Sequence, residues 1–190
     1  MGSEGSADSA TAKRILAAAA RALRSDESAS MEVIAGEAGV SRATVHRHFA
    51  TRDLLVSAAL DWASREVEQV FASAGREHAP LVVRLYEVTR ALLATKSALE
   101  AILHSQSGGQ RVSEESGVFN SARGLMATLR ESGLLSEHVG DRWATHVDLG
   151  LLRLAAQEGL GGEEELDRLT SEVLDTFLGG VGDTSLRYAR

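Results

Sequence analysis

The stretch that decides the fold is residues 31–49, MEVIAGEAGVSRATVHRHF. It reads as two short helices on either side of Gly39, and such a pair joined by a short glycine-containing turn is typical of a helix-turn-helix. Glycine suits the turn because it adopts positive φ without a steric penalty. Ser30 and Ser41 stand where helix N-caps are expected. We therefore predict helices over residues 31–38 and 41–49.

The second of these helices divides into an inward and an outward side. Val40, Val45 and Phe49 are the expected anchors on the core, and the small Ala35 lets the first helix cross closely. The outward side chains all form hydrogen bonds and none is acidic: Ser41, Arg42, Thr44, His46, Arg47 and His48. A helix fits the major groove of DNA with its N-terminal part against the base edges. This pattern predicts a DNA-binding protein.

The rest of the chain also has helical periodicity. It contains one proline, and alanine and leucine, the best helix formers, are abundant. Apolar residues recur at spacings of three and four, which marks one face of a helix. Further helices are predicted over 9–24, 51–74, from Pro80, over 97–106, from about 118 to 133, over 141–158 and over 163–178. The predicted fold is all-α, with a three-helix helix-turn-helix domain, a long fourth helix and a C-terminal helical bundle, about nine helices in all.

Charge is distributed unevenly, and the composition excludes several classes of site. Residues 10–52 carry a net charge of +3 and residues 53–190 one of −8, within a total of −7. A basic N-terminal part suits a polyanion, although charge also fluctuates along any chain. The absence of cysteine excludes disulfides, thiolate zinc sites and a cysteine nucleophile. The sequence contains no apolar run long enough to span a membrane and no signal sequence, so we expect a cytoplasmic location.

The N-terminal pattern resembles that of the TetR family of bacterial repressors. The resemblance rests on Ile34, Ala35, Ala38, Gly39, Val40, Ser41, Thr44, His48, Phe49, Arg52, Leu54 and Leu55, preceded by Ile15, Leu16, Ala18 and Ala19. It covers roughly residues 11–60, and beyond them only length and helix count agree. Ala43 and His46 stand where the family commonly has glycine and tyrosine, and Arg52 stands where lysine is common.

The resemblance implies a homodimeric repressor that an unidentified small-molecule inducer releases from a palindromic operator on double-stranded DNA. It implies a tail over residues 1–8, a DNA-binding domain over 9–52 and a ligand-binding and dimerisation domain over 53–190. Arg42 and Thr44 would contact base edges, while phosphate contacts would fix the register. The expected DNA-binding residues are Thr11, Ser41, Arg42, Ala43, Thr44, His46, Arg47, His48, Thr51 and Arg52. For His48, a packed or solvated histidine is the alternative.

The resemblance also implies a dimer interface and a ligand pocket. The last two predicted helices would pair with their copies through Trp143, Val147, Leu151, Leu154, Leu166, Leu169, Val173 and Phe177. The pocket would lie among the middle helices, with Trp62, Tyr86, Leu93, Leu103, His104, Phe119 and Met126 as candidate lining residues. Both sets have the same alternative, because apolar stripes can simply face the chain's own core.

Metal, cofactor and enzyme functions have little support in the sequence. His46 and His48 are two positions apart, so they point in different directions on a helix. No nucleophile elbow or paired carboxylates stand out, and Gly159–Gly162 reads as a turn between helices. Two alternatives to the ligand-responsive repressor remain: a helical ligand carrier with a vestigial helix-turn-helix, and an architectural DNA-binding protein that needs no ligand. Repressor and activator also remain open, because the same DNA-binding domain serves both.

Overall fold

The computed structural model describes residues 3–26, 28–73, 79–104, 114–158 and 162–182. These residues form nine α-helices, and their only β-type pairing is an isolated bridge between Leu135 and Gly182. The all-α fold class is therefore confirmed. The helices are α1 (Ser3–Ser25), α2 (Met31–Ala38), α3 (Arg42–His48), α4 (Arg52–Ser73), α5 (Leu81–Ala94), α6 (Lys96–His104), α7 (Gly117–Glu131), α8 (Asp141–Gln157) and α9 (Glu163–Val181).

Most helix boundaries lie close to their predicted positions, but the first helix is longer than expected. Helix α1 begins at Ser3 rather than Ser9, so the predicted tail over residues 1–8 is helical from Ser3 onward. The apolar periodicity that indicated the helix starts only later in the chain, and this explains the error.

The first three helices and the start of α4 share one core, and we call this unit the head. Its buried residues include Ile15 of α1, Ile34 of α2 and Val45 of α3. Leu55 and Ala59 of α4 belong to the same cluster. The core of the head therefore reaches Ala59 of α4.

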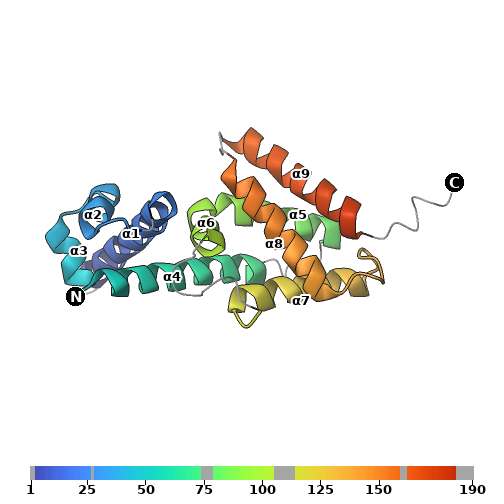
Figure 1. The fold of residues 1–190 in the computed structure, drawn as a ribbon, viewed down its shortest axis with the longest axis horizontal. Coiled ribbons are helices and arrows are strands. Elements are labelled where there is room, and N and C mark those ends of the chain that lie inside the picture. The colour runs from blue at the N-terminus through green and yellow to red at the C-terminus, as the bar shows by residue number, and fades with distance from the viewer. Residues whose placement is uncertain (1–2, 27, 74–78, 105–113, 159–161, 183–190) are drawn as a thin grey trace.

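The remainder of α4 and helices α5 to α9 form a second unit, which we call the body. Helix α4 carries the head at one end and packs against α6 and α7 further along (Figure 1). Helix α8 packs against α6, α7 and α9, and α5 lies against α9. The head also touches the body directly, because α1 packs against α6 and Ala20 belongs to the core of the body.

The buried face of α4 differs from the one expected. From the spacing of apolar residues in the sequence, the expected inner face consists of Leu55, Ala58, Trp62, Val70 and Phe71. The fully buried residues are instead Leu55, Ala59, Ala63 and Val67, spaced four apart along one side of the helix. Small side chains on this stripe permit close approach of α1 and α6. The larger aromatic side chains lie half-buried on its flanks.

Candidate functional sites

Helix α3 starts at a well-formed cap. The Ser41 hydroxyl accepts a hydrogen bond from the backbone N–H of Thr44 at 3.1 Å and lies 2.9 Å from the Thr44 hydroxyl. This bond satisfies one of the free N–H groups at the start of the helix. Ser41, one of the expected DNA-binding residues, therefore also has the structural role of a helix cap that the sequence predicted.

The turn before α3 is held by a glycine and by an arginine from α1. Gly39 has φ of 63°, a left-handed conformation that glycine adopts readily. Arg14 donates a hydrogen bond from Nη2 to the carbonyl oxygen of Ala38 at 2.8 Å, at the C-terminal end of α2. Sequence reasoning did not assign this role to Arg14, because its partner lies 24 residues away.

The outer side of α3 is polar, basic and exposed. Val45 is fully buried in the head and anchors the helix. Arg42, Ala43, His46 and Arg47 are exposed, whereas Thr44 is half-buried. Helix α3 lies at the end of the head remote from the body (Figure 1). The chain's own fold therefore leaves this surface open to a large partner.

Arg42 and His46 lie one turn apart on this surface and contact each other. The Nε of Arg42 donates to Nε2 of His46 at 3.4 Å, a long hydrogen bond between exposed side chains. Sequence reasoning treated the two as separate contacts. The structure brings them together, so the position of Arg42 depends partly on the residue at position 46.

The other predicted DNA contacts, at the last residue of α3 and in α1 and α4, are less exposed, except for the exposed Thr51 just before α4. Thr51 accepts a hydrogen bond from the N–H of Leu54 at 3.3 Å and caps α4. Arg52 is half-buried and donates from Nε to the carbonyl oxygen of Ala29 at 3.0 Å, which joins α4 to the segment before α2. His48 is half-buried with its ring centroid 6.3 Å from that of Phe49, and Thr11 of α1 is also half-buried.

The predicted pocket residues fall into two separate core clusters. Leu93 and Phe119 are buried in the cluster of the body that also contacts Trp62. Met126 is buried in a second cluster, against which Tyr86 packs. The Tyr86 hydroxyl reaches Asp167 of α9 at 3.4 Å, so it points toward the surface. Leu103 and His104 belong to α6, but their side chains lie outside the described residues.

The predicted dimer residues divide between an exposed and a buried set. On α8, Trp143 and Leu154 are 65% and 62% exposed, and Val147 and Leu151 are half-buried. On α9, the four predicted residues instead face the chain's own core: Leu166, Leu169, Val173 and Phe177 are buried. This face of α9 turns inward because α5 and α8 pack against that helix. In the single chain these four side chains therefore follow the stated alternative, an apolar stripe that faces its own core.

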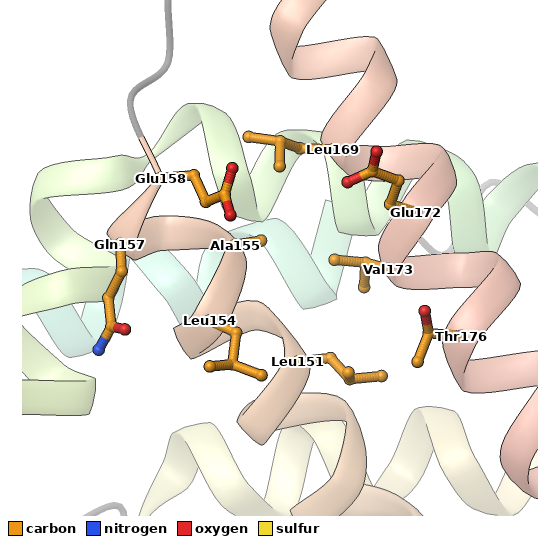
Figure 2. A pocket seen from close by; sticks show the side chains of 9 residues that line it. All are labelled: Leu151, Leu154, Ala155, Gln157, Glu158, Leu169, Glu172, Val173 and Thr176. Carbon is orange, nitrogen blue, oxygen red and sulfur yellow. The ribbon is translucent and has the colours of Figure 1, made fainter.

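A groove runs between α8 and α9 beside the exposed stripe of α8. It has a volume of about 530 Å³, and its lining includes Leu151, Leu154 and Thr176. Figure 2 shows Leu151 on the α8 side of this groove and Thr176 on the α9 side. The groove and the stripe together form a continuous, partly apolar surface.

Two carboxylates that the sequence analysis did not single out are buried in the body. Asp148 of α8 and Glu100 of α6 are each 3% exposed. Burial raises the pKa of Asp148 to about 7. Within the described ranges no group of three or more potential metal ligands occurs, and no helix is long and apolar enough to span a membrane. Asp148 was missed because it lies off the apolar stripe of α8, where a charged residue is normally exposed.

Comparison with known proteins gives one family match. The family profile "Bacterial regulatory proteins, tetR family" matches residues 15–59, which are the head from the middle of α1 to Ala59 of α4. No curated protein sequence matches this chain significantly.

Solved structures of similar fold cover nearly the whole chain. The LfrR regulator of Mycobacterium smegmatis, solved in complex with proflavine, has 19% identity and a TM-score of 0.68, over 90% of this chain and 96% of its own. The ketosteroid regulator KstR2 of Mycobacterium tuberculosis has 14% identity and a TM-score of 0.67, over 90% of this chain and 95% of its own. The regulator SCO0520 of Streptomyces coelicolor has 23% identity and a TM-score of 0.59, over 92% of this chain and 99% of its own. The head therefore matches the profile of the tetR-family regulatory proteins, and the chain as a whole shares the fold of these solved regulators.

Proposed function

We propose that this protein is a homodimeric repressor, which binds a palindromic operator through its two α3 helices and dissociates when a small molecule binds the body. The observation that carries the proposal is the outer surface of α3. Arg42, His46 and Arg47 are exposed there, the helix contains no acidic residue, and Val45 fixes it to the core of the head. A rigid, basic helix on an open surface is suited to the major groove.

Individual residues of α3 then take distinct roles. Arg42 would read a base edge, and a bidentate pair with guanine contributes about 1–3 kcal/mol of discrimination. His46 would position Arg42 through the contact between their side chains. Thr44 would reach a neighbouring base, and Arg47 would contact a base or a phosphate. Thr51 and the half-buried Thr11, His48 and Arg52 would border the phosphate backbone at the edges of the contact.

A second copy of the chain is the proposed occupant of the exposed stripe on α8. Palindromic half-sites require two heads, and a symmetric dimer presents the same surface from each subunit. Trp143 and Leu154 are large apolar side chains that a second copy would cover. Gly150 lies between them, and a Cβ atom placed there would meet nothing within 4 Å in the single chain. The absence of a side chain at this position lets a second α8 approach closely.

Ligand response is supported by the way the head and body are joined. Helix α4 belongs to both units, and α1 of the head packs against α6 of the body. A ligand that favours one arrangement of the body would therefore change the position of α3. The regulator of similar fold solved with proflavine, and KstR2 named for ketosteroids, support a small-molecule effector here.

The same division suggests the domain organisation and the location. We infer a DNA-binding domain that corresponds to the head and ends near Ala59, followed by a ligand-binding and dimerisation domain that corresponds to the body. A protein that binds operator DNA in a bacterium would act in the cytoplasm.

Selection from a random double-stranded DNA library with the full chain tests the proposal. We expect a palindromic motif to be enriched, and the salt dependence of its binding to indicate several phosphate contacts. Arg42→Ala should weaken binding to this motif at least tenfold and relax the preference at one base pair of each half-site. Arg123→Ala is the matched control, because Arg123 is an exposed residue of α7 in the body.

The other outcomes identify the alternatives. Binding without sequence preference would favour an architectural DNA-binding protein, and no binding to any DNA would favour a ligand carrier. A reporter gene placed behind the selected motif then separates repression from activation.

A further inference from the structure

We propose that the body binds an organic cation, with the carboxylate of Asp148 as its counter-ion. This inference rests on the proposed ligand response, and it names the chemical class of the effector. It comes from the arrangement of polar groups inside the body.

Asp148 is a buried acid without a partner among the residues that the structure describes. Its side chain is 3% exposed, and no hydrogen bond or ion pair reaches its carboxylate from any residue that the structure describes. It shares a buried face of α8 with Thr145 and Leu152, and the Thr145 hydroxyl donates instead to the carbonyl oxygen of Asp141 at 2.7 Å. Buried charges in proteins are normally paired, so an unpaired one marks a candidate ligand site.

Trp62, on helix α4 of the body, provides a second unsatisfied group. Its Nε1 atom is buried and has no hydrogen-bond partner within the described part of the chain. The indole packs against the core cluster that contains Leu149 and Leu152, the neighbours of Asp148 on α8. A ligand that fits both groups offers a positive charge to Asp148 and a hydrogen-bond acceptor to Trp62.

The helices that carry these residues surround a common interior. Helix α4, with Trp62, packs against α6 and α7, and helix α8, with Asp148, packs against the same two helices. The four helices therefore form a closed ring, which we call the helix ring. Phe119 of α7 is buried in it, and aromatic faces such as those of Phe119 and Trp62 attract organic cations.

The charges inside the body favour a cation over an anion. The buried charged residues of the described chain are Glu100 and Asp148, and no lysine, arginine or histidine is buried there. Glu100 belongs to α6, another member of the helix ring, and already has an interaction partner. An anionic ligand would meet the carboxylate of Asp148, and the described residues offer no buried positive side chain to compensate for that repulsion. A bare metal ion fits poorly, since no group of three potential ligands lies among the described residues.

Ionisation of Asp148 would be coupled to binding. Because burial raises the pKa of Asp148 to about 7, most of its population is protonated at pH 6. A cation beside the carboxylate favours the charged form and lowers its pKa. Cation binding at pH 6 should therefore release close to one proton into the solvent.

Two probe ions of matched shape and opposite charge test the inference: tetraphenylphosphonium and tetraphenylborate. We expect calorimetry on the full chain, free of DNA, to show at least tenfold tighter binding of the phosphonium ion. Repetition at pH 6 in buffers of different ionisation enthalpy should detect the released proton. Asp148→Asn, which keeps the shape and removes the charge, should weaken phosphonium binding at least tenfold and abolish proton release. The control is Asp175→Asn, at an exposed position of α9.

Three results would overturn the inference. The first is equal affinity of the wild type for the two ions, and the second is an unchanged affinity for the phosphonium ion in Asp148→Asn. The third is that the wild type binds neither tetraphenylphosphonium nor the smaller benzyltrimethylammonium ion. The DNA-binding experiment tests the proposed repressor separately from the proposed cation site. Sequence-selective DNA binding without cation binding would refute only the cation, whereas cation binding without any DNA binding would refute the proposed repressor.

Discussion

Replacement of Asp148 by asparagine should stabilise the folded protein, and the gain should grow with pH. The pKa of this carboxyl rises from an ordinary value of 3.8 to about 7 on folding, and burial is the cause. A difference of about three pKa units, at about 1.4 kcal/mol each, corresponds to about 4 kcal/mol. Ionisation of Asp148 at high pH should lower the free energy of unfolding by this amount.

The sign follows from proton linkage. Between pH 4 and pH 7 the folded state retains the proton on Asp148, while the unfolded chain has already released it. The free energy of unfolding therefore falls as the pH rises through this window, and above about pH 7 the loss is complete. Asparagine does not ionise, so Asp148→Asn avoids the loss. The variant should exceed the wild type by less than about 1 kcal/mol at pH 4 and by about 4 kcal/mol at pH 8.

Urea unfolding followed by circular dichroism at pH 4, 5, 6, 7 and 8 measures this difference. All proteins should be compared at one chain concentration, because self-association changes apparent stability. Asp175→Asn, at its exposed position on α9, should show a small difference that does not depend on pH. A gain in Asp148→Asn that stays constant with pH, or a variant less stable than the wild type at pH 8, would refute the assignment of Asp148 as an unpaired buried acid.

Three further predictions concern the head and the dimer. Gly39→Ala should lower the free energy of unfolding by about 1–2 kcal/mol, because an alanine at φ of 63° is strained. The control Gly36→Ala, within α2, should be neutral or stabilising, and thermal unfolding of the two variants measures the difference. Ser41→Ala should cost about 0.5–2 kcal/mol through the lost cap of α3, and DNA binding should weaken in parallel in an anisotropy titration. Gly150→Gln should dissociate the proposed dimer in analytical ultracentrifugation while the helical circular dichroism signal stays unchanged. The matched Gly124→Gln on α7, where an added Cβ atom also meets nothing within 4 Å, should remain dimeric, and a dimeric Gly150→Gln would contradict the proposed contact through α8.

The helix-turn-helix could be predicted from the sequence because its determinants are local. Ser30 accepts from the N–H of Val33 and Ser41 from that of Thr44, each three residues further along. The turn depends on one glycine, Gly39. Interactions over such short distances along the chain leave a direct mark in residue order. The number and approximate positions of the helices were predictable for the same reason, since the apolar periodicity of each helix lies within its own segment.

Tertiary structure alone decided which neighbour covers each apolar face. The stripes on α8 and α9 looked equivalent in the sequence, yet Trp143 and Leu154 are exposed while Leu169 and Phe177 are buried. Periodicity shows that a helix has an apolar face, but packing determines whether that face lies against the chain's own core or remains open. The partners of Arg14 and Arg52 and the isolation of Asp148 inside the body depend on residues distant in the sequence, and only the folded chain brings those residues together or keeps them apart.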